Sequence, residues 1–128
     1  MNKILLVIAG GALGSLLRYM TSDLMQKYYQ GGFPIGTFTV NIIGSFIIGI
    51  LWSIAEIMNL SMSFRLFIFV GILGGFTTFS SFSIESINLI RDNHFKIALL
   101  YINATNVIGI AISFEGIFVG KYITELVK

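Results

Sequence analysis

The chain contains no cysteine, one proline and one histidine, and only 11% of its 128 residues are charged. The absence of cysteine excludes disulfides and thiol chemistry. His94, in a charged stretch that is typical of a loop, is an isolated solvated residue rather than a ligand or a base. Globular proteins carry about 25% charged residues, so this chain cannot coat a water-exposed surface of its size. Its 55% hydrophobic residues and mean hydropathy of +0.89 indicate that lipid surrounds it.

Long apolar runs divide the chain into four candidate membrane spans. A bilayer core about 30 Å thick needs roughly 20 helical residues for each crossing. Charged and turn-forming residues delimit spans over about residues 3–27, 34–56, 65–90 and 96–120. The sequence therefore predicts an all-α membrane protein with one four-span domain over residues 1–128. The first apolar run also resembles the start of a signal peptide, but it continues to Leu17 and three spans follow, so we interpret it as a span.

The third span contains a segment of low helix propensity. Two adjacent glycines (Gly74 and Gly75) and two adjacent threonines (Thr77 and Thr78) together cost roughly 3 kcal/mol relative to alanine. Backbone that leaves the helix at membrane depth persists only where protein buries it or where it lines a wet cavity. We therefore predict that the third helix is broken near its middle, from Gly74 to Thr78. The alternative is a continuous helix whose glycines allow close packing.

The basic residues are balanced between the two sides of the membrane. If the first span starts on side A, that side receives Lys3, Arg65, Lys121 and Lys128, and side B receives Lys27, Arg91 and Lys96, with Arg18 near that end. A near tie gives no clear orientation by the positive-inside rule. It favours weakly biased insertion or insertion in both orientations, and two opposite insertions could pair as an antiparallel dimer.

Polar side chains repeat along single faces of two spans. Thr37, Asn41, Gly44 and Ile48 share one face of the second span, and Tyr101, Thr105, Gly109 and Ser113 share one face of the fourth. Polar groups are costly in lipid, so each raises a functional question. Asn41 either bonds a neighbouring helix or offers a donor to an anion in a pore. The hydroxyls of the fourth span either bond their own helix backbone or line a path.

Two charged residues and two phenylalanines complete the candidate site. Arg18 follows Gly14 by four residues, and it either snorkels to the interface or sets a positive potential in an anion vestibule. Glu85 either couples transport to protons or organises a hydrogen-bond network. Phe79 and Phe82 are spaced i, i+3 directly after the predicted break. Their ring edges, the positive ends of the aromatic quadrupoles, could line a path for a small anion.

Four motifs, one on each span, resemble those of the Fluc (CrcB) fluoride channels over essentially the whole chain. They are Gly10-Gly11-x-x-Gly14-x-x-x-Arg18-Tyr19, Gly36-Thr37-x-x-Val40-Asn41-x-x-Gly44-x-Phe46-x-x-Gly49, Gly71-x-x-Gly74-Gly75-x-Thr77-Thr78-Phe79-Ser80-Ser81-Phe82-Ser83-x-Glu85, and Tyr101-x-x-x-Thr105-x-x-x-Gly109. The chain departs from the family at two positions. Ser81 stands where threonine is common and Thr105 where serine is common, and both residues keep the hydroxyl.

This resemblance implies an antiparallel, dual-topology homodimer in the cell inner membrane that exports fluoride passively from the cytoplasm and lowers its toxicity. It implies two pores for each dimer, lined by Phe79, Phe82, Asn41, Tyr101, Thr105, Thr37 and Ser81. It also implies one structural sodium ion at the dimer centre, held by the backbone carbonyls of Gly74 and Thr77. Arg18 falls in the vestibule region. We also assign Glu85 as a vestibule or structural residue.

Two other classes of membrane protein fit the sequence less well. A small dual-topology multidrug or cation exporter also has four spans, but such exporters carry a glutamate in the first span, where no acidic residue precedes Asp23 here. An assembly subunit without transport activity would explain the glycines but not the segment from Thr77 to Phe82. The sequence contains no P-loop and no pair of catalytic groups at membrane depth, so we do not expect an enzyme.

Overall fold

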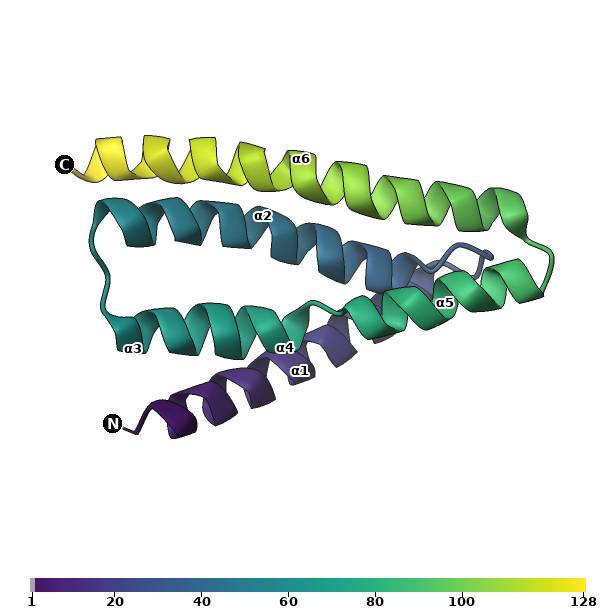
Figure 1. Ribbon diagram of the computed structural model, residues 1–128, viewed down its shortest axis with the longest axis horizontal. Coiled ribbons are helices and arrows are strands. Elements are labelled where there is room, and N and C mark those ends of the chain that lie inside the picture. The colour runs from purple at the N-terminus through teal and green to yellow at the C-terminus, as the bar shows by residue number, and fades with distance from the viewer. Residues whose placement is uncertain (1) are drawn as a thin grey trace.

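The computed structural model describes residues 2–128, which form helices joined by short loops (Figure 1). The helices are α1 (Lys3–Tyr28), α2 (Ile35–Ile57), α3 (Met62–Arg65), the π-helix η1 (Leu66–Leu73), α4 (Gly74–Phe76), α5 (Phe79–Arg91) and α6 (Phe95–Val127). Four helical segments are long and apolar enough to cross a membrane: Lys3–Tyr28, Ile35–Ile57, Met62–Arg91 and Phe95–Val127. The predicted all-α class and the four spans are therefore confirmed.

The helix ends follow local sequence signals. The Asn2 side chain accepts a hydrogen bond from the Ile4 N–H at 2.9 Å and starts α1. Asn59 and Asn93 adopt positive φ angles of 50° and 61° in the two loops that flank the third span, a conformation that asparagine tolerates better than most residues. The Ala55 carbonyl in the last turn of α2 accepts from the Leu60 N–H at 3.0 Å and from the Arg65 guanidinium at 2.7 Å, so the end of α2 is tied to the loop and to α3.

The third span is broken, but over a shorter stretch than the sequence predicts. Thr77 (φ −78°, ψ 156°) and Thr78 (φ −149°, ψ 122°) are extended, whereas Gly74 keeps helical angles of −63° and −34°. The prediction that the chain leaves the helix from Gly74 onward is therefore wrong. β-Branched threonines suit extended backbone, while the glycine pair remains in the short helix α4.

Glycines bring α1 close to the first half of the third span. A Cβ on Gly10 would lie 2.9 Å from the Cα of Gly71, and one on Gly75 would lie 2.7 Å from the Gly11 carbonyl oxygen. Such backbone contact between membrane helices requires small residues. Gly71 and Gly75 therefore set the distance between α1 and the third span, and Gly75 does so without leaving the helix.

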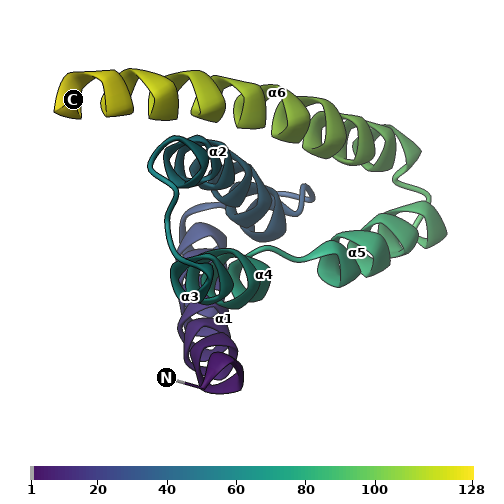
Figure 2. The ribbon, with the colours of Figure 1, turned by 60° about the vertical axis from the view of Figure 1, so that its left-hand side comes forward.

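A second set of glycines joins α6 to α2. A Cβ on Gly116 would collide with the Phe46 carbonyl oxygen, and one on Gly120 would collide with the Ser53 hydroxyl. The sequence predicted that the fourth span ends near residue 120. Gly120 instead packs against α2 within the helix, and α6 continues to Val127. Figures 1 and 2 show α6 along one side of α2, with the third span on the other side of α2 and α1 crossing the third span at an angle.

Candidate anion path at the helix break

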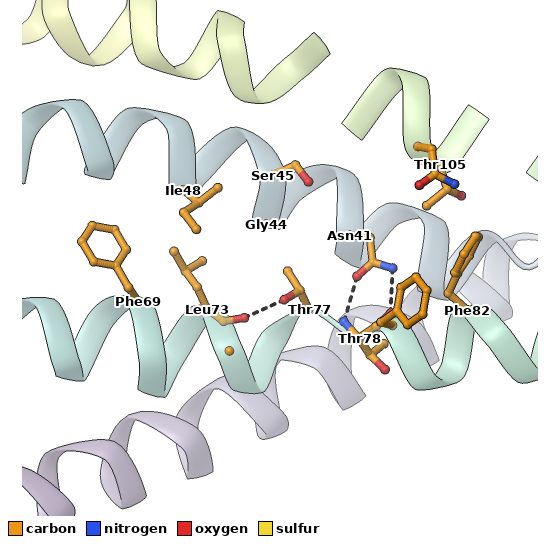
Figure 3. A pocket seen from close by; sticks show the side chains of 13 residues that line it. Asn41, Gly44, Ser45, Ile48, Phe69, Leu73, Thr77, Thr78, Phe82 and Thr105 are labelled. Carbon is orange, nitrogen blue, oxygen red and sulfur yellow. Dashed lines mark hydrogen bonds between the residues drawn. The ribbon is translucent and has the colours of Figure 1, made fainter. Parts of the chain in front are cut away.

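Asn41 of α2 binds the backbone at the break. Its Oδ1 accepts from the Thr78 N–H at 2.8 Å, and its Nδ2 donates to the Thr78 carbonyl oxygen at 2.9 Å (Figure 3). In an uninterrupted helix the Thr78 N–H would donate to the carbonyl of Gly74 instead. The amide of Asn41 thus replaces helix hydrogen bonds that the break removes, as buried backbone groups require.

Threonine and serine hydroxyls finish the two half-helices. The Thr77 hydroxyl and N–H both donate to the Leu73 carbonyl oxygen, at 2.9 and 3.0 Å. The Thr78 hydroxyl accepts from the Ser81 N–H at 3.2 Å and caps α5. It also lies 3.2 Å from the Ser81 hydroxyl. Ser81 therefore lies in the cap of α5, beside the break.

A cavity of about 450 Å³ lies beside the break. Its lining residues come from α2, the third span and α6: Asn41, Gly44, Ser45, Ile48, Phe69, Leu73, Gly74, Thr77, Thr78, Phe79, Phe82, Thr105 and Asn106 (Figure 3). The Thr105 hydroxyl is buried here and has no hydrogen-bond partner within residues 2–128. We call this space the central cavity.

The two phenylalanines after the break line the central cavity in different surroundings. Their ring centroids are 5.5 Å apart with an interplanar angle of 48°. Phe82 is 7% exposed, whereas Phe79 is 76% exposed in the single chain. The ring of Phe82 also packs against the ring of Tyr101, and the two centroids are 5.1 Å apart.

Glu85 links three helices through its two carboxylate oxygens. Thr37 of α2 donates to Oε1 at 2.8 Å, and Tyr101 of α6 donates to Oε2 at 2.8 Å. Tyr101 is fully buried, and Thr37 is 8% exposed. The structure thus brings three predicted site residues into one hydrogen-bonded cluster, which adjoins the central cavity where Tyr101 packs against Phe82.

Residues 5–117 match the family model described as CrcB-like protein, Camphor Resistance (CrcB). The chain belongs to the CrcB family. With its four spans, it is a multi-pass protein of the cell inner membrane.

Several curated CrcB relatives share most of the sequence. The chain is 48% identical to a protein of Parabacteroides distasonis over the full length of both. It is 43% identical to one from Agrobacterium fabrum and 39% identical to one from Flavobacterium psychrophilum, each over 94% of this chain and 98% of the relative. All three relatives are named fluoride-specific ion channel FluC.

The backbone of this CrcB chain provides carbonyl oxygens where the resemblance implies sodium. Within residues 2–128, no three His, Asp or Glu side chains gather as a metal site, so a cation there would depend on carbonyl oxygens, which suit a hard monovalent ion. Gly74 and Thr77 both line the central cavity, at the end of the first half-helix. Their position fits such an ion.

The remaining predicted residue and the unpredicted ones also have clear places. Arg18 is half-buried on α1 and does not line the central cavity. Sequence reasoning placed Thr78 in the predicted break but not among the site residues, although both ends of the Asn41 amide bond to its backbone. It also missed Phe33, whose ring meets Tyr101 edge-on at 5.4 Å and 84°. The adjacent threonines Thr77 and Thr78 were a sequence signal for Thr78, but nothing in the sequence indicated the contact of Phe33 with Tyr101.

Proposed function

We propose that this chain forms a fluoride channel, and that fluoride leaves the cytoplasm through it passively, which lowers fluoride toxicity. The observation that carries the proposal is the 48% identity, over the full length of both chains, to a protein named fluoride-specific ion channel FluC. The central cavity supports it independently, because it joins hydroxyls, an amide and two phenylalanine rings at a helix break. The three relatives described above are all named fluoride-specific ion channels, and none of the three is named an exporter.

The chemistry of the cavity suits a small, strongly hydrated anion. A pore must replace the water around fluoride with several close donors without trapping the ion at a full positive charge. The Thr105 hydroxyl has no hydrogen-bond partner among the described residues 2–128, so its proton can be donated to an anion. The edges of Phe79 and Phe82 add weaker positive poles. Asn41 holds the break, and the second proton of its amide nitrogen remains available to the cavity.

The proposal includes an antiparallel homodimer with two pores. Phe79 lies in a cavity wall and is 76% exposed in one chain, so a second copy packed against this wall would close the path around its ring. A sodium ion between the two copies would be held by the Gly74 and Thr77 carbonyls of each chain. When bound, it would supply a positive charge that links the carbonyl ends of the half-helices.

Fluoride efflux from liposomes that contain only the purified protein tests the proposal. A potassium ionophore removes the charge imbalance, and ion-selective electrodes follow fluoride and chloride separately. We expect rapid fluoride efflux and chloride efflux close to that of empty liposomes. Equal rates for the two anions, or no fluoride efflux, would show that the proposed function is wrong.

A further inference from the structure

A second cavity, of about 250 Å³, lies beside the loop between α1 and α2. It is lined by Gln26, Tyr29, Gly31, Gly32, Phe33, Pro34, Ile35, Gly36, Thr37 and Glu85. The loop lies at the same end of the molecule as the connection between α5 and α6, away from the break between α4 and α5 (Figure 1). We call this space the loop cavity.

Three helices lead from the central cavity to the loop cavity in the same order. On α5, Phe82 lines the central cavity and Glu85, one turn later, lines the loop cavity. On α2, the corresponding pair is Asn41 and Thr37. Residues three or four apart lie on the same face of a helix, so the two cavities follow one another along the same faces.

The fourth span repeats this step and marks the boundary between the cavities. Thr105 lines the central cavity, and Tyr101, one turn earlier, donates its hydroxyl to Glu85. The ring of Tyr101 packs against Phe82 on one side, at 5.1 Å, and against Phe33 on the other, at 5.4 Å. Phe33 lines the loop cavity. The fully buried Tyr101 therefore separates two spaces that are otherwise in line.

The loop cavity lies where one span ends and the next begins. Its rim includes Gln26, in the last turn of α1, and Tyr29, directly after it, and both are exposed. Tyrosine at a span end is typical of the membrane–water interface. A path that continues from the central cavity past Tyr101 would therefore reach water through this space.

We propose that the loop cavity is one mouth of the ion path of this chain, with Gln26 and Gly32 at its rim and Phe33 next to the Tyr101 constriction. This inference rests on the proposed function. It adds residues of the α1–α2 loop to the path, none of which belongs to the polar faces or motifs that first indicated a pore.

Single cysteines test the mouth directly, because the natural chain has none. Gln26→Cys places a thiol on the rim of the loop cavity, and Tyr28→Cys is the matched control, since Tyr28 is 83% exposed and lies outside the lining. Gly32→Cys is a second rim variant. A Cβ at Gly32 would meet only the end of the Ile97 side chain, at 3.3 Å, which can shift. A bulky, charged methanethiosulfonate reagent is added to both sides of liposomes containing each variant, and mass spectrometry measures the labelled fraction.

We expect the reagent to lower fluoride efflux roughly fivefold or more in Gln26→Cys and Gly32→Cys, because an adduct at the mouth obstructs a path for single ions. Each variant is compared with its own untreated sample, and Tyr28→Cys and the cysteine-free protein should not respond. Full labelling with unchanged efflux, or no labelling of either rim cysteine, would overturn the inference while wild-type efflux still supports a fluoride channel. If the wild type carries no fluoride, the proposed function fails first and the mouth with it.

Discussion

The hydroxyl of Thr105 illustrates how a single buried group connects stability with transport. It is buried without a hydrogen-bond partner in the part of the chain that the structure describes, an arrangement that costs about 1–3 kcal/mol. Valine has nearly the same shape and no hydroxyl. We therefore expect Thr105→Val to leave the free energy of unfolding unchanged or to raise it by about 1 kcal/mol or more, and to lower fluoride efflux. Thermal unfolding in detergent and liposome efflux measure the two effects.

Ser113→Ala is the matched control for Thr105→Val on the same helix. The Ser113 hydroxyl bonds the carbonyl oxygens of Ser45 and Gly109, both at 3.0 Å. Its removal should lower stability and leave efflux close to the wild type. Unchanged efflux in Thr105→Val would mean that the hydroxyl does not contact the ion.

The two phenylalanines beside the break give a second prediction at this scale. Isoleucine keeps most of the bulk of a ring but removes its positive edge. Phe79→Ile and Phe82→Ile should each lower fluoride efflux about tenfold or more, which corresponds to a barrier higher by about 1.4 kcal/mol. Phe118→Ile is the control, because Phe118 is 66% exposed on α6 and lines no part of the central cavity. Wild-type efflux in both test variants would mean that the two rings only pack against their neighbours and do not contact the ion.

Among the helices, the third span shows what the sequence could and could not predict. Hydropathy and the charged ends predicted four spans, since those signals depend only on composition along the chain. The glycines and threonines predicted a break but not its width, because low helix propensity does not tell whether a glycine unwinds or packs. Gly75 packs against Gly11, so α4 stays helical.

Contacts between spans depend on helix packing that one sequence does not encode locally. The polar faces were predicted, but the pairing of Asn41 with Thr78 joins residues on different spans. The contact of Phe33 with Tyr101 has the same character. The π-helical turns of η1 had no sequence signal, because Leu66–Leu73 reads as an ordinary apolar helix.

The pairing of Asn41 with Thr78 predicts how the break itself responds to mutation. Asn41→Ala would leave the N–H and the carbonyl of Thr78 without partners, so we expect the free energy of unfolding to fall by about 1–3 kcal/mol for each group. Asn103→Ala is the control, because the Asn103 amide is exposed and bonds only the Leu99 carbonyl of its own helix, at 2.8 Å. Equal stability of the two variants in thermal unfolding would contradict the role assigned to Asn41.

At the scale of the whole molecule, mutations of the adjacent glycines Gly74 and Gly75 distinguish packing within one chain from contact between the two chains of the proposed dimer. A Cβ on Gly75 would lie 2.7 Å from the Gly11 carbonyl oxygen, whereas one on Gly74 would have only ordinary contact with the Phe69 carbonyl, at 3.6 Å. Gly75→Ala should therefore destabilise the single chain. Gly74→Val should leave the chain folded but weaken the dimer and its sodium site, since Gly74 is exposed at the centre proposed for the dimer.

Helical content and the mass of the protein in detergent separate these two effects. A folded, fully dimeric Gly74→Val protein that still requires sodium would contradict the proposed dimer centre. A stable Gly75→Ala protein would contradict the contact between α1 and α4.

The balance of basic residues predicts the final property of the whole assembly, insertion in both orientations. The connection between α2 and α3 lies at the same end of the molecule as the N-terminus, and the loops that join α1 to α2 and α5 to α6 lie at the opposite end (Figure 1). Met58 and Met62 are exposed at the first of these connections, and Gln30 and His94 are exposed in the two loops at the other end. Changing Met58 and Met62 together to lysine adds charge to one side and should orient most chains the same way. Antiparallel pairs then become rare, so efflux should fall. Met58→Lys combined with Gln30→Lys is the control, because it adds the same charge without bias and should keep efflux.

Co-expression of the variant Met58→Lys, Met62→Lys with the opposite variant, Gln30→Lys with His94→Lys, should restore efflux, because each supplies the orientation that the other lacks. Labelling of a terminal tag from each side of the membrane measures orientation, and one-sided labelling of a fully active wild type would refute dual topology.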